Sequence, residues 1–183
     1  MKSLFSGISA VSLLVALTAF AEPTSVAAPK VGDTAPEFSL PYATRDSIAG
    51  DDLKLSAIIG KQSIVLAFYP ADWSGGCTKE VCSLRDNFAS FGALNADVIA
   101  ISGDYVNSHQ AWAKANNLPF RLASDHDHAV AKLYGSYNEA NGHDRRTVFV
   151  VDPKGKIAYS DMMYSPRDSV SFGKLQLALK GMK

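Results

Sequence analysis

The chain has 183 residues, 47% of them hydrophobic, which is enough for one domain with a complete core. Basic and acidic residues are equal in number, 18 of each. This balance excludes the strongly basic surface that nucleic-acid binding requires, so we expect no nucleic-acid partner.

The first 21 residues have the pattern of a secretory signal peptide. Lys2 supplies the positive start, residues 11–20 form an apolar run, and Ala19-Phe20-Ala21 is a small-residue cleavage site. Because the run is shorter than the ~20 residues of a membrane span, cleavage after Ala21 is favoured over an uncleaved anchor. We therefore expect an exported protein, periplasmic or secreted, with no stable membrane association.

One domain is predicted after the cleavage site. Residues 22–30, rich in Ala, Pro, Ser and Thr, are expected to form a flexible lead-in to a domain over residues 31–183. The domain opens with an extended segment at residues 33–40. Residues 48–60 are ambiguous, with a short strand or a turn as the favoured interpretation.

Strand and helix patterns alternate from residue 64 onward. Continuous apolar runs predict buried strands over residues 64–69, 97–102 and 118–123. Helices are predicted over 78–91, from a cap at Asn107 or Ser108 to 116, over 129–134 behind a cap at Asp125 or Asp127, and over 169–182. In the last helix, Val170, Leu175 and Leu179 are expected to face inward.

A hairpin signal lies near the end of the chain. The turn Asp-Pro-Lys-Gly separates strand-like residues 146–152 from strand-like residues 156–159. The complete order predicts an α/β fold, a mixed central sheet with helices on both faces and an antiparallel hairpin near one edge. Sites in such sheets lie at the carboxyl ends of strands.

Both cysteines of the chain follow the first predicted strand. A Gly-Gly turn precedes Cys77, and a helix-forming stretch that contains Cys82 follows it. A cysteine at a helix start is surrounded by backbone N–H groups and the positive end of the helix dipole, which favour a nucleophilic thiolate. Cys77 is therefore a candidate nucleophile, and Cys82 a candidate partner.

The spacing of the two cysteines argues against a permanent disulfide. Helical geometry places residues i and i+5 about 7.5 Å apart along the axis and about 140° apart around it, so their Cα atoms are separated by about 8.6 Å. A disulfide bridges no more than about 7 Å without backbone movement. A Cys77–Cys82 bond would thus require the helix start to unwind, which is a property of a redox device.

The stretch Pro70-x-x-x-Ser74-x-x-Cys77 resembles the P-x-x-x-(T/S)-x-x-C active-site motif of the peroxiredoxins, the AhpC/TSA superfamily. Arg146, ahead of the run TVFVVD, is at the place of the family's second-site arginine. The similarity covers residues 31–180, and the cysteine spacing resembles the bacterioferritin-comigratory (PrxQ) branch, with flanking sequence similar to the AhpE-like branch. The family fold is thioredoxin-like.

The resemblance implies a thiol-dependent peroxidase that reduces hydrogen peroxide and organic hydroperoxides. Cys77 would be the peroxidatic cysteine, and Cys82 would resolve its sulfenic acid as an intramolecular disulfide. Arg146 and Ser74 would bind the peroxide oxygens, and Pro70 would close the pocket. A thioredoxin-like dithiol would restore the thiols, no cofactor or metal is required, and the enzyme would be a monomer or a homodimer.

Two departures and ambiguities accompany this interpretation. Gly75-Gly76 stand where many members have a proline, which raises the ordering cost of the loop. Glu80, at the family's glutamate position, has a simpler explanation as an acidic residue that complements the helix dipole. His126 and His128 flank Asp127, but two histidines in a loop without a third ligand are weak evidence for a metal.

Two other functions compete with a peroxidase. An exported thiol-disulfide oxidoreductase of the same fold would ordinarily carry C-x-x-C, whereas this chain has C-x-x-x-x-C. A non-enzymatic copper or thiol chaperone could use the two thiolates, which suit Cu(I). It would have no use for Arg146, since a cation beside the sulfurs repels a metal ion.

Overall fold

The computed structural model describes residues 27–165 and 168–182. The predicted signal peptide and most of the predicted lead-in lie outside these ranges. Within them, no helix has the length and apolar character that crossing a membrane requires.

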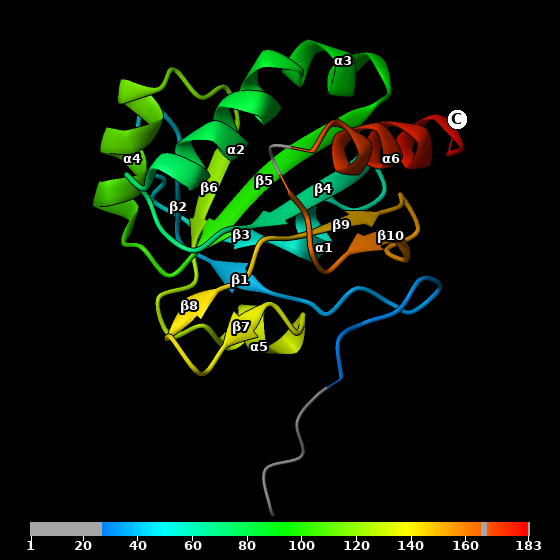
Figure 1. Cartoon of the computed structure of the whole chain (residues 1–183), viewed down its shortest axis with the longest axis horizontal. Coiled ribbons are helices and arrows are strands. Elements are labelled where there is room, and N and C mark those ends of the chain that lie inside the picture. Colours follow the sequence, from blue (N-terminus) through cyan, green and yellow to red (C-terminus); the bar gives the residue numbers. More distant parts are fainter. Residues whose placement is uncertain (1–26, 166–167, 183) are drawn as a thin grey trace, which may run out of the picture.

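A six-stranded mixed sheet forms the centre of the domain (Figure 1). Its strands, in spatial order, are β10 (Ile157–Asp161), β9 (Thr147–Val151), β4 (Ser63–Phe68), β5 (Ala96–Ser102), β6 (Arg121–Ser124) and β2 (Tyr42–Ala43). β4, β5 and β6 are parallel, and the other strands pair antiparallel. The predicted hairpin is confirmed as β9–β10 at one edge.

Helices cover both faces of this sheet, as predicted (Figure 1). Val65 and Ala67 of β4 point to one face, and Ile64, Leu66 and Phe68 to the other. The first face packs against α2 (Gly75–Asp86), α3 (Phe88–Ala93), α4 (Val106–Ala115) and α6 (Ser169–Lys180). The second packs against α1 (Leu55–Ile58) and α5 (Ala129–Leu133). Burial on both faces explains why the central strands are continuous apolar runs.

Two small strand pairs lie outside the central sheet. β1 (Ser39–Leu40) pairs with β3 (Leu53–Lys54), and β7 (Tyr137–Asn138) pairs with β8 (His143–Asp144). The ambiguous residues 48–60 therefore contain β3 together with α1, a helix that the sequence pattern does not indicate.

The helix predicted over residues 78–91 is two helices. It begins earlier, at Gly75, and it is interrupted at Asn87, between α2 and α3. The Asn87 side chain donates to the Ser83 carbonyl over 2.9 Å, and its backbone N–H contacts the same oxygen over 3.2 Å. Asparagine competes in this way with continuation of a helix, which explains the interruption.

Other predicted boundaries need smaller corrections. α4 begins behind Tyr105 rather than Asn107 or Ser108, and Val170 of α6 is 57% exposed instead of facing inward. Val170 lies in the first turn of α6, ahead of the two leucines, Leu175 and Leu179, that do enter the core. The strand predicted over residues 118–123 is β6, which begins only at Arg121. Residues 117–120 first complete the end of α4, where Asn117 has a φ of 52°.

Candidate active site

Cys77 lies in the first turn of α2, just beyond the carboxyl end of β4. Ser74 caps this helix in an extended conformation, and its Oγ accepts the Cys77 N–H over 3.3 Å. A serine hydroxyl satisfies in this way one of the free N–H groups of a helix start. The cap fixes the position of the Cys77 backbone, and the side chain of Cys77 is fully buried.

Arg146 comes just before β9, the strand that pairs with β4, and its side chain contacts Cys77. β9 runs antiparallel to β4 and pairs Thr147 with Phe68, so the residue before β9 emerges where β4 ends. The guanidinium Nη2 of Arg146 donates to Cys77 Sγ over 3.2 Å. The structure thus places a cation and a helix start beside the sulfur. The neighbouring Arg145 is exposed.

Gly76 gives the guanidinium its space. A Cβ at position 76 would lie 2.7 Å from Arg146 Nη2, whereas a Cβ at Gly75 would meet nothing within 4 Å. Both glycines belong to the first turn of α2 rather than to a free loop. The glycine pair that departs from the family pattern therefore includes one position, Gly76, where a side chain would require the Arg146 guanidinium to move.

Glu80 is the partner of Arg146 and is more than a complement to the helix dipole. Its carboxylate is buried on α2 and forms an ion pair with Arg146 Nη1. Burial raises the pKa of Glu80 to about 7 against the opposing effect of Arg146. In the other direction, Glu80 and Cys77 outweigh burial and raise the pKa of Arg146. Arg146 thus bridges a carboxylate and a sulfur.

Partly exposed side chains lie next to the buried sulfur of Cys77. The Arg146 side chain is 26% exposed although it contacts a buried sulfur, and Pro70 and Ser74 are half-buried. Tyr164 is buried nearby, where burial and then Glu80 raise its pKa, and its backbone N–H donates to the Arg146 carbonyl over 3.1 Å. The predicted site residues apart from Cys82 are therefore Pro70, Ser74, Cys77 and Arg146.

Cys82 lies on the same helix but has different neighbours. Its Sγ is 3.9 Å from the Asn116 Oδ1 at the end of α4, and it is half-buried. Arg85 donates to the Asn116 carbonyl over 2.8 Å, and its pKa is raised by Asp86 and, to a smaller degree, by Cys82. Both cysteines are free thiols. The structure does not bring Cys82 to Cys77 while α2 is intact.

A buried polar cluster beside the site was missed from the sequence. Asp72 accepts from Tyr69 OH over 2.8 Å and from Ser108 Oγ over 2.7 Å, and His109 Nδ1 is 3.0 Å from its Oδ2. Asp72, Tyr69 and His109 are all buried. A signal for His109 does exist: it is three and four residues before Trp112 and Ala113, which face the core from α4.

The histidines after β6 have partners within the protein. His128 Nδ1 is 2.7 Å from Asp144 Oδ1, and the His126 ring stacks on Tyr105 with 3.8 Å between ring centres. Burial raises the pKa of Asp144 to about 7 against the effect of His128. Within residues 27–165 and 168–182, no group of three metal-ligating side chains is present.

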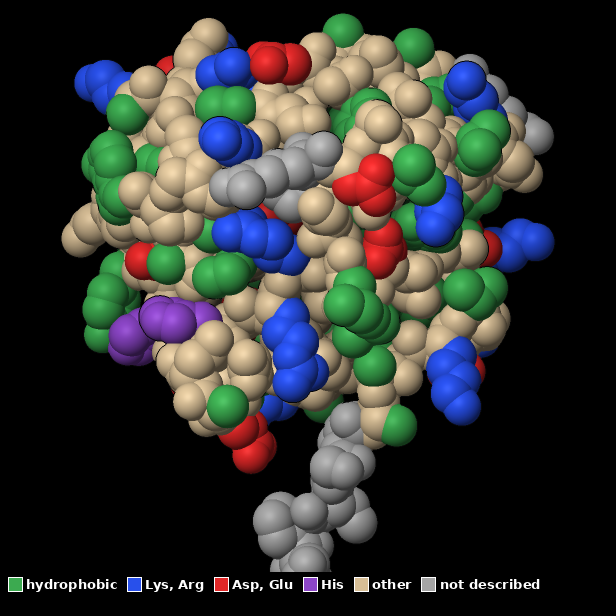
Figure 2. Space-filling model, viewed as in Figure 1, with side chains coloured by type: hydrophobic (Ala, Val, Ile, Leu, Met, Phe, Trp, Pro, Cys, Tyr) green, Lys and Arg blue, Asp and Glu red, His purple; other side chains and the backbone are tan. Residues whose placement is uncertain are grey.

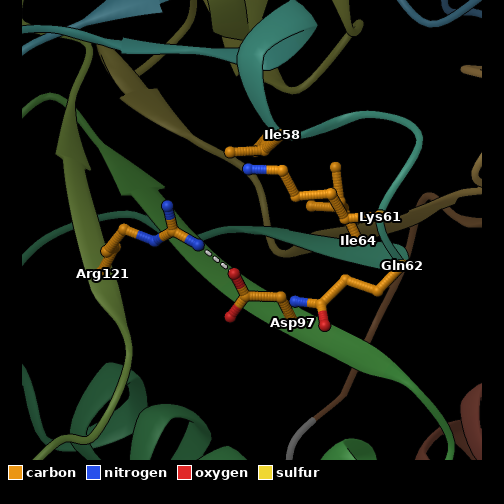
Figure 3. Close-up of a pocket in the computed structure, with 6 residues that line it drawn as sticks. All are labelled: Ile58, Lys61, Gln62, Ile64, Asp97 and Arg121. Atoms are coloured by element: carbon orange, nitrogen blue, oxygen red, sulfur yellow. Dashed lines mark hydrogen bonds and ion pairs between the residues drawn. The ribbon is translucent and has the colours of Figure 1, made fainter.

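A hollow lies at the end of the sheet away from Cys77. A cavity of about 210 Å³ is lined by Ile58, Lys61, Gln62, Ile64, Asp97 and Arg121 (Figure 3). Arg121 and Asp97 form an ion pair across it. Ile64 is near the start of β4, so this cavity is separated from Cys77 by the length of the strand.

Basic and acidic side chains are interspersed on the face seen in Figure 2.

Comparisons with known proteins show the family to which the chain belongs. The model of the AhpC/TSA family matches residues 31–160. A putative peroxiredoxin bcp of Coxiella burnetii is 38% identical over 135 residues, which are 70% of this chain and 85% of that protein. The chain belongs to the peroxiredoxins. A chloroplastic peroxiredoxin Q of Triticum aestivum is 39% identical, over 82% of this chain and 68% of its own length.

A solved structure extends the likeness of this peroxiredoxin to the fold. Peroxidoxin BcpB of Mycobacterium tuberculosis has a TM-score of 0.75 and 30% identity, over 85% of this chain and 99% of that one. The bacterioferritin-comigratory/PrxQ branch and the thioredoxin-like fold predicted from the sequence both fit these relatives. The chain is accordingly a thiol peroxidase, and neither the oxidoreductase nor the copper-chaperone alternative is favoured.

Proposed function

We propose that this peroxiredoxin is an atypical two-cysteine peroxidase, with Cys77 as the peroxidatic and Cys82 as the resolving cysteine. The observation that carries the proposal is the contact of Arg146 Nη2 with Cys77 Sγ, over 3.2 Å, at the start of the helix that also holds Cys82. Hydrogen peroxide and organic hydroperoxides are the proposed substrates.

In the first step, the Cys77 thiolate attacks one peroxide oxygen and the O–O bond breaks. The other oxygen leaves, takes a proton and departs as water or an alcohol, while Cys77 becomes a sulfenic acid. Arg146 is the donor best placed to stabilise the leaving oxygen, because its guanidinium contacts the sulfur and is 26% exposed. The Ser74 hydroxyl, whose oxygen caps the Cys77 N–H, still has its own proton to donate.

In the second step, the Cys82 sulfur attacks the sulfenic sulfur and water leaves, which forms a disulfide. The intact helix opposes this step, since Cys82 faces Asn116 and the end of α4. The first turn of α2 therefore has to unwind. A thioredoxin-like dithiol then reduces the disulfide and is itself oxidised.

The location and assembly of the enzyme complete the proposal. The signal-peptide pattern of residues 1–21 supports export to the periplasm or the medium, where a dithiol reductant of that compartment would serve. A monomer or a homodimer is sufficient, because both cysteines belong to one chain.

The peroxidatic role is tested by peroxide consumption with a thioredoxin-like dithiol as the reductant. Cys77→Ser is expected to lose turnover completely, whereas Cys82→Ser is expected to stop after one oxidation. Undiminished turnover by Cys77→Ser would refute the mechanism.

The resolving role has a separate test. Mass spectrometry after one equivalent of hydrogen peroxide should find a Cys77–Cys82 disulfide within one chain. A stable sulfenic acid or an intermolecular disulfide in the unmodified protein would contradict the assignment of Cys82 and leave that of Cys77 intact.

A further inference from the structure

The loop between β4 and α2 has an unfavourable conformation that its own sequence does not explain. Trp73, the residue before the Ser74 cap, has a φ of 59°, in the left-handed region that residues with a side chain rarely adopt. Its ring is 58% exposed, so apolar burial does not hold it there. Contacts elsewhere in the loop must hold Trp73 in this conformation.

Those contacts converge on Asp72. Its two carboxylate oxygens are bonded by Tyr69 OH, Ser108 Oγ and His109 Nδ1, at distances between 2.7 and 3.2 Å. Its backbone N–H donates to Asp104 Oδ2 over 2.8 Å. Asp72 itself is 6% exposed. The residue is thus fixed by Tyr69 just after β4, by the loop after β5 and by α4.

The bonds of this cluster identify the donor of His109. His109 is completely buried, and its Nε2 has no hydrogen-bond partner among the described residues. Its Nδ1 faces both carboxylate oxygens of Asp72 and is the ring nitrogen placed to donate to them. Tyr69, Ser108 and His109 then all donate to a carboxylate, and such charge-assisted bonds are the stronger kind.

Ser108 connects the cluster to the next loop residue. Its hydroxyl donates to Asp72 Oδ2 over 2.7 Å and accepts from Trp73 Nε1 over 3.2 Å. One hydroxyl on α4 therefore holds two successive residues of the loop. The next residue is Ser74, which caps α2 and fixes the Cys77 backbone.

We propose that Asp72 and Ser108 are positioning residues for the peroxidase reaction, which hold the 70–74 loop so that Ser74 caps α2 and Cys77 meets Arg146. The inference rests on the proposed roles of Cys77 and Cys82. The folded helix start is needed for attack on peroxide, and the unwound one for disulfide formation. Loosening the loop should therefore slow the first step without slowing the second.

The test separates the two steps in the full chain. Quenched time points with excess hydrogen peroxide are analysed by mass spectrometry, so that loss of the reduced protein reports the first step and growth of the disulfide the second. Ser108→Ala is expected to lower the first rate constant about tenfold, because it removes two bonds from the loop, one of them to a carboxylate. The second rate constant should be unchanged or higher.

Three further variants complete the test. Ser108→Thr keeps the hydroxyl and is expected to restore the first rate constant to within about twofold of the unmodified protein. Asn107→Ala, at the exposed neighbouring position of α4, is the matched control and should also stay within about twofold. Asp72→Asn removes the carboxylate itself and should slow the first step at least as much as Ser108→Ala.

The outcomes distinguish the failure of this inference from that of the proposed function. If the unmodified protein is oxidised at Cys77 and Ser108→Ala matches it, the positioning role is wrong and the proposed function stands. An equal slowing of both steps by Ser108→Ala, or no rescue by Ser108→Thr, would also overturn it. If the unmodified protein does not react, the proposed function and this inference fall together.

Discussion

Gly76 and Arg146 are packed so closely that a side chain at position 76 would overlap the guanidinium, with 2.7 Å between a Cβ and Nη2. Gly75, one residue earlier in the same turn, has open space around it. A side chain is therefore disfavoured for steric reasons at Gly76 but not at Gly75, and an alanine substitution at each position tests this difference.

Gly76→Ala should displace Arg146 from Cys77 and lower the rate constant of Cys77 oxidation by about tenfold, since a preorganised donor is moved out of place. Gly75→Ala should leave that rate constant unchanged. It should raise the free energy of unfolding by about 0.5–1 kcal/mol, because alanine is the better helix former. Stopped-flow oxidation and urea unfolding measure both quantities, and equal oxidation rates for the two variants would contradict the steric explanation.

Arg146→Lys should lower the rate constant of Cys77 oxidation by about a hundredfold. A lysine keeps the charge, but it lacks the planar fork that contacts Glu80 and Cys77 at once. Arg145→Lys, at the exposed adjacent position, is the control and should react like the unmodified protein. A lysine at position 146 that supports normal oxidation would mean that charge alone suffices.

Glu80 should make the protein less stable as the pH rises. Its pKa is about 7 in the folded state against 4.5 for an ordinary glutamate, so the folded state holds the proton more tightly than the unfolded state. Stability from this group is therefore full below pH 4.5 and is lost as the pH rises to 7. Glu80→Gln removes the titration, so its free energy of unfolding, relative to the unmodified protein, should increase between pH 5 and pH 7.5.

Urea unfolding at these two pH values measures that relative change. Glu37→Gln, at a residue that is not fully buried, is the comparison for a glutamate outside the site. A difference between Glu80→Gln and the unmodified protein that is constant with pH would contradict the raised pKa of Glu80.

Asp125→Ala should cost about 2–3 kcal/mol of unfolding free energy. Its buried carboxylate accepts the N–H groups of Val130 over 3.1 Å and of Ala131 over 2.7 Å, and the substitution leaves both donors unsatisfied. Asp127→Ala is the matched control: that side chain is exposed, and the one hydrogen bond it accepts within residues 27–165 and 168–182 comes from the Ala129 N–H, over 3.0 Å. Its cost should not exceed about 1 kcal/mol, the usual contribution of one exposed hydrogen bond. Thermal unfolding of both variants checks the order.

Much of the sheet could be predicted because each central strand contains the evidence for its own burial. The apolar runs that begin at Ile64 and directly after Asp97 predict β4 and β5 from local sequence alone. The turn that ends at Gly155 predicts the β9–β10 hairpin in the same way. The position of Cys77 at a helix start is equally local. The break at Asn87 was missed because the apolar period continues across it through Phe88 and Phe91.

The neighbours of the site could not be predicted in the same way. An acidic residue in the first turns of a helix is fully explained by the helix dipole, so nothing local indicates that Glu80 is buried against Arg146. The Asp72 cluster joins the end of β4 to α4, and its members are up to 40 residues apart in the sequence. Such long-range contacts are set by the packing of the sheet. Arg146 was predicted as a site residue only from the resemblance to a family, because the local sequence pattern does not indicate its contact with Cys77.

The interruption at Asn87 limits the cysteine-bearing helix to 12 residues. Isolated helices of about that length are only marginally stable in water, and α2 starts with two glycines. Its four buried anchors are Cys77, Glu80, Val81 and Leu84, so half of what holds it belongs to the reacting cluster. Because the Cys77 side chain is fully buried, an oxygen added to the sulfur has to displace its neighbours, so oxidation should weaken the packing of α2 and favour its unwinding.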